Sequence, residues 1–185
     1  MVALPARGDT ARRHPVKSPY LPTSPGSLQV LDRLQSGRLT RVRELRREIE
    51  IDAPPAAVWG ILTDFGAYSD WNPFMLSIKG DPKVGQQLTV RIEPPGGRGM
   101  TFKPKVLASE PDRELRWLGR FLVPGLIDGE HTLAIEPVEE GRCRFIQQER
   151  FTGVLVGLFK STLDKTETGF EEMNAALKKR AEAAA

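Results

Sequence analysis

His131 and Glu149 are the residues of this chain best suited to chemistry. A carboxylate beside an imidazole orients the ring and permits general acid–base catalysis. The same two side chains can instead form a buried polar pair, in which each satisfies the other and no reaction takes place. Both interpretations require that the two side chains lie next to each other in the fold, which depends on the secondary-structure elements that carry them.

The segments that carry these two residues predict a β-hairpin. Residues 129–137 and 142–151 alternate in polarity and are joined by Glu139-Glu140-Gly141, whose glycine suits the left-handed position of a three-residue loop. If Val138 lies opposite Arg142, every opposed pair sums to 280, and His131 opposes Glu149. A register shifted by one residue would turn the apolar residues of the two strands to opposite faces of the sheet.

The same register, in which opposed pairs sum to 280, also places neighbouring residues on the face of the candidate site. Leu133 then opposes Gln147, and Ile135 opposes Phe145, so all four share the inner face with the His131–Glu149 pair. Aromatic side chains placed throughout the rest of the body are expected to form the core, and a subset to line a cavity. The complete set of candidate ligand-binding residues is Trp59, Tyr68, Trp71, Phe74, Phe102, Trp117, His131, Gln147, Glu149, Phe151, Phe159 and Phe170.

A series of strands is expected to position these side chains. Alternating polarity, bounded by turn residues such as Gly80-Asp81-Pro82 and Glu110-Pro111-Asp112, predicts the strands. Pro104 lies inside one of them, which indicates an edge or a bulge. The predicted strands are 41–52, 75–79, 87–93, 100–109, 113–120, 129–137 and 142–151.

Helices complete the predicted elements. Short helices are predicted over 55–63 and 64–70, the first beginning at a Pro pair where a missing N–H costs nothing. A long amphipathic helix follows the last strand, because apolar residues recur there every three or four positions. Its apolar face comprises Phe159, Leu163, Thr166, Phe170, Met173 and Leu177.

The segment around the first helix carries a family resemblance. Ala53-Pro54-Pro55-Ala56-Ala57-Val58-Trp59 is followed by Tyr68-Ser69-Asp70-Trp71-Asn72-Pro73. This order resembles the opening of the START/polyketide-cyclase superfamily, often abbreviated SRPBCC, and the resemblance extends over about residues 43–183. Asp128-Gly129-Glu130-His131 also resembles a segment that recurs in uncharacterised members of that superfamily.

The resemblance implies an α+β helix-grip fold. In that fold a curved antiparallel sheet of about six to seven strands wraps around the long C-terminal helix, with two short helices after the first strand and an internal cavity. A sheet with one apolar face and a single long helix with an apolar stripe agree with this arrangement. The resemblance is specific for the fold and identifies no reaction.

The beginning of the chain differs from the rest in composition. Residues 1–47 contain ten Lys and Arg against three Asp and Glu, whereas the whole chain of 185 residues has a formal net charge of +3. The body is therefore mildly acidic, which argues against a nucleic-acid surface. We expect residues 1–40 to be a disordered, basic, Pro-rich leader and 41–185 to be the ligand-binding domain. Ser27 and Gly37 would bound a short helix within the leader.

Several kinds of site and compartment are not favoured by the sequence. Cys143 is the single cysteine, so no internal disulfide is possible, and this fits a reducing, cytoplasmic location. One of the two histidines, His14, lies in the leader, so no metal site and no cofactor are expected. No apolar run is long enough to span a membrane. The sequence does not indicate an oligomeric state.

Three functions remain open. The first is binding of a small hydrophobic or aromatic molecule between the sheet and the long helix. The second, implied by the resemblance, is cyclase or dehydratase chemistry on a polyketide-like substrate, with His131 as acid or base and Glu149 orienting it. The third is a non-catalytic lipid-delivery or chaperone-like module that uses the apolar loop 121–127. Whether the protein is an enzyme is thus left undecided.

Overall fold

The computed structural model describes residues 33–35, 38–121 and 123–184. The strands are β1 (Arg33–Gln35), β2 (Arg38–Ile51), β3 (Met75–Lys79), β4 (Thr89–Ile92), β5 (Met100–Phe102), β6 (Lys105–Glu110), β7 (Glu114–Phe121), β8 (Ile127–Glu139) and β9 (Arg142–Gly153). The helices are α1 (Pro55–Thr63), α2 (Tyr68–Trp71) and α3 (Lys160–Ala184), with short 3₁₀ segments η1 (Phe65–Ala67) and η2 (Val156–Phe159).

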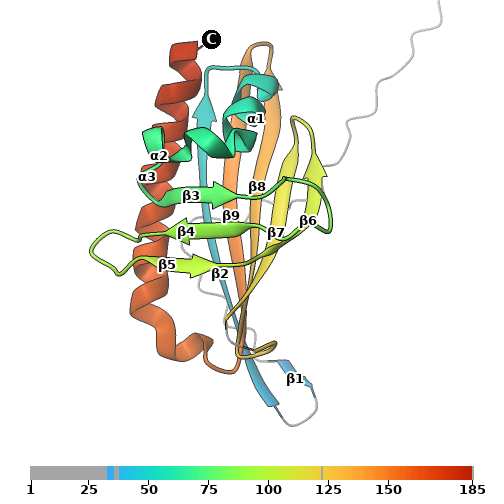
Figure 1. The fold of residues 1–185 in the computed structure, drawn as a ribbon, viewed down its shortest axis with the longest axis vertical. Helices are drawn as coiled ribbons and strands as arrows, with labels where there is room; N and C mark the ends of the chain where they lie inside the picture. Colours follow the sequence, from blue (N-terminus) through green and yellow to red (C-terminus); the bar gives the residue numbers. More distant parts are fainter. Residues whose placement is uncertain (1–32, 36–37, 122, 185) are drawn as a thin grey trace, which may run out of the picture.

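The fold is α+β, with antiparallel sheet packed against one long helix, as predicted. The described strands form a six-stranded sheet in the order β1-β2-β9-β8-β7-β6 and a three-stranded sheet in the order β3-β4-β5. Figure 1 shows α3 running along the large sheet, the small sheet crossing in front of them, and α1 and α2 next to β3, the edge strand of the small sheet. The six strands of the large sheet agree with the predicted six to seven, whereas the separate three-stranded sheet was not predicted.

Pro104 accounts for the division into two sheets. The predicted strand 100–109 is broken there, because proline has no backbone N–H to continue a ladder. β5 ends at Phe102 and β6 begins at Lys105, and the two strands belong to different sheets. The carbonyl of Pro104 still accepts a hydrogen bond from the backbone N–H of Leu88 at 2.8 Å. The segment before β4 thereby joins the edge of the large sheet.

The first described residues also differ from the prediction. Arg33–Gln35 is a strand that pairs with residues 38–40, so this part of the predicted helix between Ser27 and Gly37 is wrong. β2 begins at Arg38, before the predicted strand start at residue 41. The predicted leader otherwise falls on residues 1–32 and 36–37, which lie outside the described residues.

The apolar stripe of α3 packs on the inner face of the large sheet, as the periodicity predicts. Phe170, Met173 and Leu177 are fully buried and belong to the same core as the inner residues of the strands, and Leu163 is buried as well. The first turns of α3 are tied to β2 by Arg43, which donates to the carboxylate of Asp164. This hydrogen bond is the main reason why the pKa of Asp164 is lowered.

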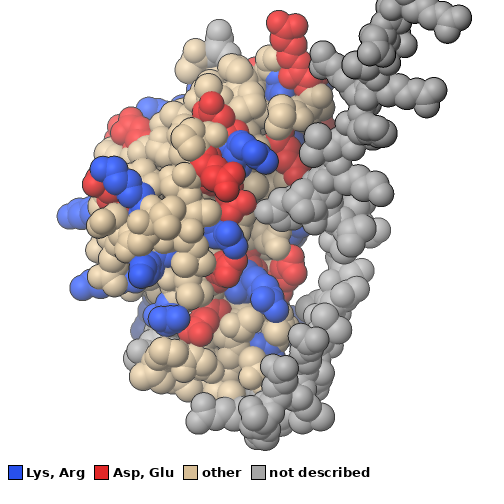
Figure 2. Space-filling view, turned by 90° about the vertical axis from the view of Figure 1, so that its right-hand side faces the viewer, with Lys and Arg blue, Asp and Glu red and all other residues tan. Residues whose placement is uncertain are grey.

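Charges lie mainly on the outside. Figure 2 shows basic and acidic side chains interspersed over the face that it presents, without a field of one sign. On the outer face of the large sheet they form ion pairs, such as that of Arg116 with Glu130 at 2.9 Å. The few polar side chains buried inside, among them His131 and Gln147, therefore stand out against an apolar core.

Candidate functional site

A row of three side chains crosses the inner face of the large sheet. Trp117 on β7 pairs with His131 on β8, and His131 pairs with Glu149 on β9. The predicted register of the hairpin is therefore confirmed. The assumption used at its turn is corrected, because Arg142 pairs with Glu139, and the ladder has an irregularity between Pro137 and Glu139.

His131 is buried and held on every side. Its side chain is 4% exposed, and its Nδ1 lies 3.2 Å from Oε2 of Glu149. Its Nε2 lies 3.3 Å from the amide nitrogen of Gln147. The ring stacks on Trp117, with centroids 5.0 Å apart and an interplanar angle of 6°. Its other contact is edge-to-face with Phe170. Both nitrogens and the ring are thus engaged by protein groups.

The tautomer of His131 follows from these partners. The amide nitrogen of Gln147 donates, so Nε2 of the imidazole must accept, and the proton is on Nδ1. Nδ1–H then donates to the carboxylate of Glu149. In this arrangement Nε2 of the imidazole carries no proton, and Oε2 of Glu149 accepts from Nδ1–H. Of the pair, Glu149 is the more accessible, with 17% of its side chain exposed.

Two glycines form the next row of the sheet. Gly119 on β7 pairs directly with Gly129 on β8, and Gly129 pairs with Phe151 on β9. A Cβ at Gly119 would meet nothing closer than the carbonyl oxygen of Gly129, at 3.8 Å. Because Gly119 has no side chain, the space above it is left unfilled, whereas the carboxylate of Glu149 and the ring of Phe151 lie over Gly129. The sheet is thereby hollowed beside the Trp117–His131–Glu149 row.

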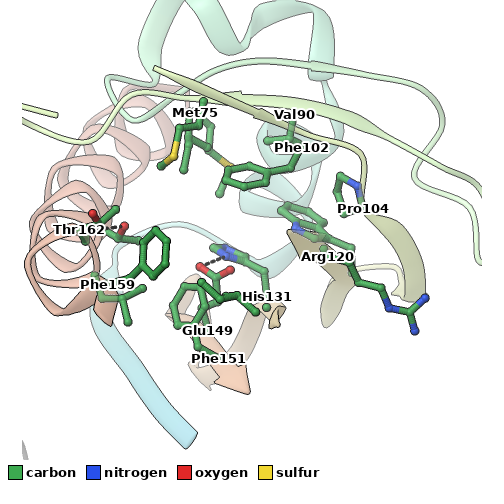
Figure 3. Close-up of a pocket in the computed structure, with 18 of the residues that line it drawn as sticks. Met75, Val90, Phe102, Pro104, Arg120, His131, Glu149, Phe151, Phe159 and Thr162 are labelled. Carbon is green, nitrogen blue, oxygen red and sulfur yellow. Dashed lines mark hydrogen bonds and ion pairs between the residues drawn. The ribbon is translucent and has the colours of Figure 1, made fainter. Parts of the chain in front are cut away.

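This hollow is part of a cavity with three walls. The large sheet forms one wall, the small sheet and Pro104 a second, and η2 with the start of α3 a third. Figure 3 shows these walls by Glu149, by Phe102, and by Phe159 with Thr162. The cavity has a volume of about 140 Å³. Its lining residues are Phe74, Met75, Val90, Ile92, Met100, Phe102, Pro104, Trp117, Gly119, Arg120, Ile127, Gly129, His131, Glu149, Phe151, Phe159, Thr162, Leu163 and Thr166.

Arg120 is the one cationic side chain among these lining residues. It is 55% exposed, and its Nε lies 3.9 Å from Oδ1 of Asp128. In Figure 3 its guanidinium points away from Glu149 and out of the cavity. The carboxylate of Glu149 is therefore the charged group that the interior of the cavity presents.

The structure brings together part of the predicted ligand-binding set. The predicted residues that line the cavity are Phe74, Phe102, Trp117, His131, Glu149, Phe151 and Phe159. The predicted residues that do not line it are Trp59, Tyr68, Trp71, Gln147 and Phe170. Gln147 and Phe170 lie directly behind the site, since both contact His131.

The other three belong to the helical end of the core. Tyr68 is fully buried, and its hydroxyl donates to the backbone carbonyl of Leu62 at 2.8 Å. Burial raises the pKa of this phenol well above its usual range. Its ring packs against Trp71, at 5.2 Å between centroids. Trp59 also packs on this core. These aromatic residues therefore have structural contacts rather than contacts with the cavity.

Sequence reasoning missed the residues without bulky side chains. Gly119 and Gly129 each lie within a predicted strand, where a glycine often marks the close approach of a ligand or another chain. That signal was available in the sequence. Thr162 and Thr166 on α3 and the residues of the small sheet depend on long-range packing, and no local pattern indicates them.

Two kinds of feature are absent from residues 33–35, 38–121 and 123–184. Within them, no group of three or more His, Cys, Asp or Glu side chains is placed to hold a metal ion. No helix there combines the length and the hydrophobicity needed to cross a membrane.

Solved structures share this fold at low sequence identity. A START superfamily protein from Mycobacterium smegmatis is 18% identical, with a TM-score of 0.59, and the match covers 77% of this chain and 99% of that one. Norcoclaurine synthase from Thalictrum flavum, solved with dopamine and hydroxybenzaldehyde, is 17% identical, with a TM-score of 0.59 and coverage of 80% and 95%. The ZhuI aromatase/cyclase from Streptomyces sp. R1128 is 15% identical, with a TM-score of 0.57 and coverage of 77% and 93%.

Sequence comparison gives a more specific result than these structures. A search of curated proteins found no match. A family model described as "Polyketide cyclase / dehydrase and lipid transport" matches residues 42–182, which is most of the chain and includes the whole cavity. Together with the helix-grip fold, this match shows that the chain belongs to the polyketide cyclase/dehydrase and lipid transport family.

Proposed function

We propose that this protein binds a small hydrophobic or aromatic molecule in the cavity between the two sheets and α3. The observation that carries the proposal is Gly119, which lies opposite Gly129 in the sheet and whose missing side chain leaves the inner face unfilled beside Trp117. Well-packed cores contain few such voids, because an empty cavity forfeits contacts. An apolar cavity of roughly 150 Å³ can hold a single benzene ring. The volume of about 140 Å³ is of that size.

Filling the cavity should abolish binding without harming the fold. At Gly119 a Cβ has ordinary contacts, so Gly119→Val should place its methyl groups in the space that the ligand would occupy. We expect the affinity for benzyl alcohol to fall at least about tenfold, and the melting temperature to stay the same or rise, since valine favours strands. Titrations followed by NMR, with the signals of Trp117 as the reporter, measure the affinity, and thermal denaturation measures the melting temperature.

The matched control is Leu118→Val, on the same strand but on its outer face. It should leave the affinity unchanged. Unaltered binding of benzyl alcohol to Gly119→Val would show that the ligand lies elsewhere, and the proposal would have to be abandoned.

An enzymatic function is the second candidate. It is supported by the His131–Glu149 pair beside the cavity and by the family description, which names cyclases and dehydrases. The contacts of His131 favour Glu149 as the group that exchanges a proton with a substrate, with His131 positioning it, the reverse of the roles expected from sequence. An enzyme should lose turnover in Glu149→Gln while still binding substrate, whereas a simple binder should change only in affinity.

Lipid delivery is supported by exposed apolar side chains near the cavity. Val123 is 53% exposed and Leu158 is 79% exposed. Their two loops are joined by backbone hydrogen bonds, including that from Val154 N–H to the carbonyl of Gly125 at 3.2 Å. If these side chains contact a lipid surface, Leu158→Ser should weaken flotation with phosphatidylcholine vesicles while binding of benzyl alcohol persists. Flotation that is absent in the unmodified protein would exclude this function.

A further inference from the structure

The polar group that meets a ligand in this cavity is the carboxylate of Glu149. His131 has no free nitrogen, because Nδ1 donates to Oε2 of Glu149 and Nε2 accepts from Gln147. Stacking on Trp117 and contact with Phe170 fix the ring as well. His131 therefore acts as a positioning residue that holds the carboxylate, and it has no hydrogen bond left to offer a ligand.

The second oxygen of that carboxylate is held over Gly129. Oε1 of Glu149 lies only 2.7 Å from the place where a Cβ on Gly129 would be. Oε2 accepts from His131, whereas no donor within the described part of the chain reaches Oε1. Glycine at position 129 thus allows the carboxylate to lie flat against the strand, with one oxygen available to the cavity.

The charge of this carboxylate is not balanced inside the cavity. His131 is neutral in the observed hydrogen-bonding arrangement. Arg120, the only cation among the lining residues, lies near Asp128 and points outward. The rest of the lining is mostly apolar and includes the aromatic rings of Trp117, Phe151 and Phe159. A single negative charge among aromatic faces is an environment that favours a cation, through both the ion pair and cation–π contacts.

From this geometry we infer that the cavity selects a small apolar molecule that carries a protonated amine, with the ammonium group donating to Oε1 of Glu149. The inference rests on the proposed binding function and specifies the class of ligand for the same site. A neutral alcohol can also donate to Glu149, but it leaves the negative charge unpaired in an apolar space. A carboxylic acid anion would be repelled by Glu149 unless it turned to Arg120.

Three probes with the same ring test this inference in the full-length protein at neutral pH. They are benzylamine, which is protonated, benzyl alcohol, which is neutral, and benzoate, which is an anion. Both benzylamine and benzyl alcohol can donate a hydrogen bond to Glu149, but only the ammonium group also forms an ion pair with it, and a partly buried ion pair is screened less than an exposed one. We therefore expect benzylamine to bind about tenfold more tightly than benzyl alcohol, and benzoate to bind most weakly.

Two variants test whether the preference for benzylamine depends on Glu149. Glu149→Gln keeps the shape of the side chain, and it should reduce the affinity for benzylamine to that for benzyl alcohol. Gly129→Ala keeps the charge but displaces the carboxylate, because the new methyl group would lie only 2.7 Å from Oε1. It should also remove the preference. Glu130→Gln is the matched control: it removes a carboxylate from the outer face of the same strand, and the preference should remain.

The outcomes separate this inference from the proposed function. Equal binding of benzylamine and benzyl alcohol, or a preference that survives in both Glu149→Gln and Gly129→Ala, would overturn the choice of an amine while leaving the binding cavity intact. Tighter binding of benzoate would assign the anchor to Arg120 instead. If none of the three probes binds, the proposed function fails and this inference fails with it.

Discussion

Replacing Phe170 by alanine is expected to lower the free energy of unfolding by about 3–5 kcal/mol, which is typical of a large aromatic side chain removed from a core. Phe170 is fully buried on α3 and makes edge-to-face contacts with Phe74 at 5.6 Å and with His131 at 5.2 Å. It is not among the residues that line the cavity. Urea denaturation, with the slope of the transition compared between variants, measures the loss.

The matched control for this prediction is Phe159→Ala. Phe159 precedes α3, lines the cavity and is partly exposed, so the loss of its ring should cost clearly less stability and should weaken binding of an aromatic ligand. If Phe170→Ala has little effect on stability and Phe159→Ala has a large one, the face of α3 that packs on the sheet has been assigned incorrectly.

The elements of this fold could be predicted from sequence because their patterns are local. The period of apolar residues predicts the inward face of α3, and the bounds of α1 at Pro55–Thr63 agree with the prediction. The division into two sheets could not be predicted in the same way. Pro104 indicated an interruption, but a proline does not specify whether the strand bends, ends at an edge or passes into another sheet.

The part of the site that lies on the β8–β9 hairpin could be predicted, because the alternation of inward and outward residues determines which side chains share a face. Alternation within the β8–β9 hairpin is sufficient to place His131 opposite Glu149, even though the turn itself is closed differently. The cavity could not be predicted in this way, because it lies beside two glycines, Gly119 and Gly129, that become neighbours only when their strands pair in the fold. The large aromatic residues drew attention as ligand contacts, yet Tyr68 and Phe170 are core residues. Composition alone does not distinguish the wall of a cavity from a packed core.

The dependence of the site on buried hydrogen bonds leads to a second prediction with a large effect. His131→Leu should lower the free energy of unfolding by about 2–4 kcal/mol, because it removes an aromatic stack and leaves the amide of Gln147 without its partner. Gln147 is fully buried, its Nε2 otherwise contacts only the weak acceptor Sδ of Met173, and its Oε1 has no partner among the described residues. Water cannot readily replace the lost hydrogen bond there.

If that is the origin of the loss, removing both polar partners should cost less than the two single changes together. In Gln147→Leu with His131→Leu, no buried amide is left unsatisfied, so we expect a coupling free energy of roughly 0.5–3 kcal/mol in a double-mutant cycle. Gln148→Leu is the control, because Gln148 lies on the outer face and donates to Glu44 at 2.6 Å. Its effect should add to that of His131→Leu. Additive effects at positions 131 and 147 would show that the two side chains are not coupled.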